Sequence, residues 1–209
     1  MAGLSELGQL LHEEHFRILV GACELENRIR GASADRPLNA SDAEDRHLLS
    51  NLLDGLDRII VHHAFEEAVV FPLIRGSGDG ELTTLLTREH GAIEPKARLL
   101  GLFGRQLLGR VASADEWVRF RHAAADLVAE VMLHLEKEEL TIVQRLPSLI
   151  DASTDHELAV RHGSEALSAR ANAATVDQRP CRASRVAFTQ SEAAARAARR
   201  RSTASRPRA

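Results

Sequence analysis

Aromatic residues are scarce in this chain of 209 residues, and tyrosine is absent altogether. Aromatic content is only 3%, so the core has to be built from aliphatic side chains. Leucine and alanine, which dominate that aliphatic content, are strong helix formers. The composition therefore predicts an all-α protein, and the lack of tyrosine argues against chemistry that uses a tyrosyl radical.

Cysteines and long apolar runs are also few. The two cysteines, Cys23 and Cys181, lie in regions of very different character, which does not suggest a disulfide framework. The first residues show no basic segment followed by an apolar run, and no apolar stretch reaches the roughly 18 residues that a membrane span needs. We therefore expect a cytoplasmic protein with no signal peptide and no membrane contact.

Charge is distributed unevenly along the chain. Residues 1–150 contain 16 basic and 24 acidic side chains, whereas the segment from Arg179 to Ala209 contains nine arginines and one acid, Glu192. We interpret residues 1–150 as one folded domain and residues 151–209 as a low-complexity tail rich in Arg, Ala and Ser that is disordered. A basic tail can bind nucleic acid or an acidic partner, but no recognition fold accompanies these arginines, so a solvated tail is favoured.

Four long segments of the first domain show helical periodicity. Apolar residues recur every three or four positions over about residues 3–31, 42–74, 81–109 and 113–147. Ser41 is the expected N-cap of the second helix, and Ser113 with Glu116 forms a capping box before the fourth. Short connections between long helices predict an up-down-up-down four-helix bundle.

The two halves of this bundle repeat a pattern of histidines and carboxylates. The first and third helices each carry one Glu-His pair, and the second and fourth each carry His-x-x-x-Glu-Glu. The matching segments are Glu14-His15, Glu89-His90, His62-x-x-x-Glu66-Glu67 and His134-x-x-x-Glu138-Glu139.

This pattern predicts a metal site. Spacing of four residues places a His and a Glu on one helix face, and the four segments fall at similar heights in an antiparallel bundle. One such pair alone would be an ordinary solvated pair. Four histidines and two glutamates in one core layer would instead be costly unless they bind a cation, and imidazole with carboxylate suits iron, manganese or zinc.

The same motifs resemble a known family. HHAFEEAVVFPLI (residues 62–74) is similar to the HxxxEExxxFP signature of hemerythrin-like HHE cation-binding domains, and HLEKEELTIV (residues 134–143) resembles its second copy. The resemblance covers about residues 5–147. It implies a non-haem di-iron site with four terminal histidines and two bridging carboxylates. The implied ligands are His15, His62, His90, His134, Glu66 and Glu138.

Some assignments stay open at this point. His63 and Glu67 have the same spacing as His62 and Glu66, although Phe71-Pro72 favours the earlier register. Hemerythrins proper carry a second histidine one turn after that of the third helix, where this chain has Glu94. Glu94 is therefore either a seventh ligand or a hydrogen-bond acceptor for a ligand. Glu67, Glu94 and Glu139 are candidates for a proton relay, and the remaining histidines are expected at the surface: His12, His47, His122, His156 and His162.

Three functions fit these observations. We favour a di-iron binding protein that senses or holds iron, dioxygen, nitric oxide or peroxide. The alternative is a di-iron enzyme that disproportionates peroxide or oxidises ferrous iron. The third is a metal-free helical interaction module. A homo-oligomer is compatible with each.

Overall fold

The protein is all-helical, as its composition predicts. The computed structural model describes residues 3–177, with side chains to residue 164. Four long helices dominate: α1 (Glu6–Arg30), α2 (Ala43–Phe65), α4 (Gly80–Leu107) and α5 (Ala114–Glu138). Three further helices are α3 (Phe71–Gly76), α6 (Leu146–Leu149) and α7 (Ala152–Asp177). Within residues 3–177 the β pairing consists of a single isolated bridge between Asn39 and Val111.

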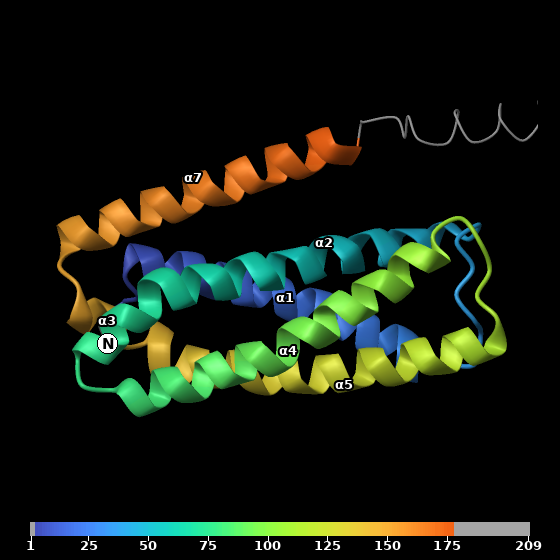
Figure 1. The fold of residues 1–209 in the computed structure, drawn as a ribbon, viewed down its shortest axis with the longest axis horizontal. Helices are drawn as coiled ribbons and strands as arrows, with labels where there is room; N and C mark the ends of the chain where they lie inside the picture. The colour runs from blue at the N-terminus through green and yellow to red at the C-terminus, as the bar shows by residue number, and fades with distance from the viewer. Residues whose placement is uncertain (1–2, 178–209) are drawn as a thin grey trace, which may run out of the picture. The chain divides into compact units, whose positions relative to one another are not determined.

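The four long helices pack in a closed ring. α1 contacts α2 and α5, and α4 contacts the same two helices. Figure 1 shows these four helices running alongside one another. A ring of this kind gives every long helix two packing partners, so each can bury an apolar stripe toward the centre.

Side chains at the helix starts explain where the helices begin. The capping box of Ser113 and Glu116 is present at the start of α5, as the sequence predicts. The N-cap of α2 is Asp42, whose carboxylate accepts hydrogen bonds from Glu44 and Asp45, so the expectation for Ser41 was wrong by one residue. Aspartate and serine cap equally well, which is why adjacent candidates are hard to separate from sequence.

The aliphatic core is divided into two clusters. One contains Ile18, Ile59, Ile93 and Leu135. The other contains its own set of buried side chains, among them Leu11, Phe65, Leu86 and Ile142. On α1, α2 and α4 the candidate histidines lie between a residue of one cluster and a residue of the other, and beyond α5 the second cluster begins at Ile142. A polar layer therefore crosses the core at the level that the sequence predicts.

Both HxxxEE helices change winding beside this layer. π-helical segments occupy Glu66–Val70 after α2 and Glu139–Val143 after α5. Each is followed by a short helix with a proline in its first turn, Pro72 in α3 and Pro147 in α6. π turns insert an extra residue per turn and are frequent at functional sites, and the simple helical pattern of the sequence does not reveal them.

A helix, α7, lies where the composition predicts the start of a disordered tail. α7 starts at Ala152, and the first compact unit of the chain ends within it, at Gly163. The described part of the second unit is the remainder of α7, while Cys181 and the arginine-rich end lie outside the described residues. No helix among residues 3–177 is long and apolar enough to cross a membrane.

Candidate metal centre

The six predicted ligands come together in the polar layer of the core. His15 lies on α1, His62 on α2, His90 on α4 and His134 on α5. Each of these rings is at most 3% exposed, and the carboxylates of Glu66 and Glu138 are fully buried. The structure thus brings the predicted set into one place.

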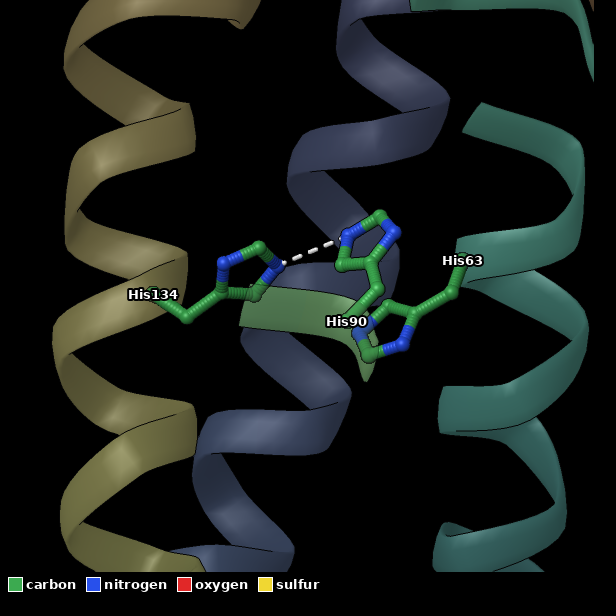
Figure 2. A group of neighbouring side chains, drawn as sticks. All are labelled: His63, His90 and His134. Atoms are coloured by element: carbon green, nitrogen blue, oxygen red, sulfur yellow. Dashed lines mark hydrogen bonds between the residues drawn. The ribbon is translucent and has the colours of Figure 1, made fainter. Parts of the chain in front are cut away.

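The four imidazoles face each other in two pairs. His15 Nε2 lies 2.9 Å from His62 Nε2, and His90 Nε2 lies 3.0 Å from His134 Nε2. Figure 2 shows the second pair, with its two rings turned toward each other from α4 and α5. The Nε2 atoms of all four rings therefore converge on the middle of the layer.

The two buried glutamates span the gap between the imidazole pairs. Glu66 Oε1 lies 3.4 Å from His62 Nε2, and its Oε2 lies 3.5 Å from His90 Nε2. Glu138 Oε1 lies 3.2 Å from His134 Nε2, and its Oε2 lies 3.6 Å from His15 Nε2. Each carboxylate consequently presents one oxygen to each pair.

These carboxylates have the environment of metal ligands. All four of their oxygens are buried and accept no hydrogen bond. Their oxygens belong to two groups, and within each group the ligand atoms lie within 4.8 Å of one another. The first group is His15, His62, Glu66 and Glu138, and the second is Glu66, His90, His134 and Glu138. Buried charges without hydrogen bonds are costly unless they are paired or bind metals, so the donor set fits cations at two adjacent positions.

An outer ring of four carboxylates orients the imidazoles. Each Nδ1 contacts a glutamate next to a ligand in sequence, at 2.7–3.0 Å. The pairs are His15–Glu139, His62–Glu14, His90–Glu67 and His134–Glu89. A ring that donates from Nδ1 presents Nε2 as its ligand atom, as metal-binding histidines usually do. This arrangement gives Glu67 and Glu139 a role that the sequence left undecided.

The outer carboxylates have further partners of their own. Glu14 also contacts His162 of α7 at 2.9 Å, and Glu89 pairs with Lys137. Glu139 also contacts the exposed His12 at 2.9 Å. Four of the five histidines assigned to the surface are exposed, but His162 is buried against Glu14 and Phe65, so that assignment was wrong. No repeat or strong periodicity in the sequence of α7 points to His162.

Electrostatics reinforce this arrangement. Burial would lower the pKa of His15, but Glu139, Glu66 and Glu138 outweigh burial and raise that pKa to about 10. Burial is likewise outweighed at His90, where Glu138 and Glu66 raise the pKa to about 10. Burial also opposes ionisation of Glu138, yet neighbouring histidines keep its pKa well below the usual value. Without a cation, at least one imidazole of each pair is therefore protonated at neutral pH.

His63 and Glu94 occupy positions beside the six predicted ligands. His63 is buried, and a ring nitrogen of His63 lies within 4.8 Å of ligand atoms of His90 and His134. Burial and the neighbouring His90 and His62 lower the pKa of His63 to about 2, so its ring is neutral. Glu94 is half-buried, belongs to neither His–Glu group, and contacts Arg98 at 3.2 Å and His63 at 3.8 Å.

Comparison with known proteins agrees with the geometry. The family model described as the hemerythrin HHE cation binding domain matches residues 9–146, which is about two thirds of the chain. Searches of curated proteins and of solved structures each gave no significant match. The matched segment begins before His15 and ends after Glu138, so it contains every residue of both His–Glu groups. The chain therefore belongs to the hemerythrin HHE cation-binding family, as the motifs predict.

Proposed function

We propose that this chain is a non-haem di-iron protein that senses or holds iron, dioxygen, nitric oxide or peroxide. Its four long helices form an up-down-up-down bundle around the metals. His15 and His62 bind one iron, His90 and His134 bind the other, and Glu66 and Glu138 bridge the two. Of the two His-x-x-x-Glu pairs on the second helix, the proposal uses His62 with Glu66 rather than His63 with Glu67.

One observation carries the proposal. Two fully buried carboxylates present four oxygens without hydrogen bonds, and both carboxylates belong to both His–Glu groups. A single cation would leave half of these oxygens unsatisfied. Two cations that share the carboxylates would satisfy all four, which also argues against a metal-free interaction module.

The ligand set favours iron over zinc. Structural zinc takes four ligands in a closed tetrahedral site, commonly with cysteine, and the cysteine among the described residues, Cys23, is exposed. Mixed imidazole and carboxylate ligands suit iron or manganese at higher coordination numbers. With two histidines and two shared carboxylates, each iron would also retain room for a small ligand.

A partly open pocket next to the layer, lined by both apolar and charged side chains, has apolar walls that suit a small uncharged ligand. It has a volume of about 270 Å³ and lies between α1, α2 and α5. Its lining includes Ile18, Ile59 and Val131, each three residues from His15, His62 or His134. Three residues correspond to about one helical turn. A molecule such as dioxygen or nitric oxide that enters this cavity would therefore come within about one turn of the proposed ligands.

A second candidate function, a di-iron enzyme, is favoured by one contact chain. His15 Nδ1 contacts Glu139, and Glu139 contacts His12, whose side chain is 55% exposed. Such a chain could carry protons between the metal layer and solvent, which peroxide disproportionation or iron oxidation requires. Bound iron would supply the redox chemistry in that case, while Glu139 and His12 would move the protons.

Metal analysis of the reconstituted protein tests the proposal. Apo-protein is loaded anaerobically with an excess of ferrous iron alone, desalted, and analysed by plasma mass spectrometry. We expect two irons per chain, and the same loading of the variant Glu66→Gln should retain far less metal. One iron or no iron per chain would refute the di-iron proposal. Sustained peroxide turnover by the iron-loaded protein would favour the enzyme, and its absence would favour sensing or holding.

A further inference from the structure

We propose that His63 is a fifth imidazole ligand, which binds the metal held by His90 and His134, and that Glu94 is its outer carboxylate. This inference rests on the proposed function and makes the two metal positions unequal. It assigns a role to two residues that lie outside both groups of His and Glu ligands.

The position of the His63 ring supports ligation. Its ring stacks on that of His90 with a centroid distance of 3.7 Å and an interplanar angle of 6°, and it meets the ring of His134 edge-on at 5.3 Å. One ligand nitrogen from each of the three residues lies within 4.8 Å of the other two. Figure 2 shows the three side chains entering one space from α2, α4 and α5. His63 is therefore close enough to share a cation with the other two once its ring rotates off the face of the His90 ring, because a metal binds in the plane of an imidazole.

The hydrogen bonding of His63 points the same way. The ring is 2% exposed and its Nδ1 is buried without a hydrogen-bond partner. Glu94 Oε1 lies 3.8 Å from that Nδ1. The four other imidazoles each contact a glutamate through Nδ1 at 2.7–3.0 Å, so His63 and Glu94 form a looser version of the same pair. In that pattern Nδ1 contacts the outer carboxylate, and Nε2 is the ligand atom.

The internal repeat shows what these positions hold when no ligand is needed. His62 matches His134 in the repeat, so the counterpart of His63 is Leu135, which is buried in the aliphatic core. Glu94 lies four residues after His90, and its counterpart four residues after His15 is Leu19. The face between α2 and α4 thus has a His–Glu pair where the matching face between α1 and α5 has two leucines. Packing alone would be met by leucine, so a buried imidazole beside a half-buried carboxylate requires another explanation.

Iron binding by matched variants tests the inference. His63→Leu copies the residue of the other half, and His47→Leu is the control, because His47 is an exposed histidine of the same helix. Ferrous iron is titrated anaerobically against a competing chelator, and the thermal unfolding of each protein is measured with and without iron. We expect His63→Leu to lower the affinity for one of the two irons by at least about tenfold, while the affinity for the other iron stays unchanged. The His47→Leu control should bind both irons as the wild type does. The midpoint of apo unfolding should not fall, because leucine leaves no buried nitrogen unpaired.

The outcomes separate this inference from the proposed function. Two irons bound equally by wild type and His63→Leu would overturn the role of His63 and leave the di-iron site standing. If the wild type binds one iron and His63→Leu binds none, the role of His63 stands and the di-iron site is overturned. A wild type that binds no metal would overturn both. A lower apo midpoint with unchanged iron binding would show that His63 only packs.

A measurement on the wild type avoids any risk that the variant misfolds. The protein is loaded with zinc as a diamagnetic probe, and long-range ¹H–¹⁵N spectra of the histidine rings are recorded. Four predicted ligands and His63 give five rings with a metal-bound nitrogen. Four such rings, with His63 in its free form, would overturn the inference.

Discussion

The two halves of the bundle carry the same inner ligands but different surroundings. α1 and α2 provide His15 and His62, with Glu14 behind His62, while α4 and α5 provide His90 and His134, with Glu89 behind His134. Glu14 is held by the buried imidazole of His162, whereas Glu89 is held by the ammonium of Lys137. Among the described residues, the His90–His134 pair alone has a further histidine beside it, His63, which comes from α2 of the other half. The comparison teaches that the repeat preserves the ligand geometry, while residues outside the repeat distinguish the two metal positions.

The largest expected effect comes from a residue that both halves share. Glu138→Gln removes charge from a carboxylate that faces both imidazole pairs. We predict that the affinity for both metals falls by well over about 100-fold. This loss is larger than the loss of affinity expected when an outer carboxylate is removed. Anaerobic iron titration measures the effect, and Glu136→Gln, at an exposed position on the same helix, is the control. Loss of only one metal would show that Glu138 does not bridge.

A smaller effect should separate the two halves. Glu14→Gln and Glu89→Gln each remove one outer carboxylate, so each should weaken its own metal position by about 10- to 100-fold. Mössbauer spectra of the protein loaded with ⁵⁷Fe should show a different iron affected in each variant. Identical spectra for the two variants would mean that the halves do not act as separate metal positions.

The dependence of metal binding on pH follows from the protonated pairs. In the metal-free protein the pKa values of His15 and His90 are raised from an ordinary 6.5 to about 10. Their protonation therefore stabilises the fold fully below about pH 6.5, and this contribution is lost as pH rises toward 10. Metal has to displace these protons, so apparent affinity should rise over the same range. Calorimetry in buffers of different ionisation enthalpy should show at least two protons released per chain at pH 7, because the pKa of His134 is raised as well, and no release would contradict the assignment.

How far the sequence predicts this centre depends on which contacts are local. The His-x-x-x-Glu spacing and the Glu-His pairs are local patterns, and they brought all six residues of the layer into view. The contact of His162 with Glu14 joins residues 148 positions apart, and α7 offers no motif that marks it. The π turns could not be foreseen, because they add a residue within an unbroken apolar pattern. His63 was ambiguous because its neighbour His62 has the same spacing to a glutamate, and only the packed rings separate their positions.

The smallest predicted effect concerns access to the metal layer. Gly55 lines the pocket next to this layer, and a Cβ added there meets nothing within 4 Å. Gly55→Leu should slow the oxidation of the reduced protein by dioxygen a few-fold while raising the free energy of unfolding by about 0.5–1 kcal/mol, because leucine favours helix more than glycine does. Gly91→Leu is the control, since Gly91 is an exposed helical glycine that is not part of the cavity lining. Stopped-flow mixing with oxygenated buffer measures the rate, and equal slowing in both variants would remove the cavity from the account.

The central claim is that two metals share Glu66 and Glu138. Anomalous diffraction at the iron absorption edge, from crystals of the iron-loaded protein, tests this claim most directly. Two peaks per chain are expected, one beside His15 and His62 and the other beside His90 and His134, with both glutamates between them. A single peak, or two peaks of which one lies outside this buried layer, would contradict it.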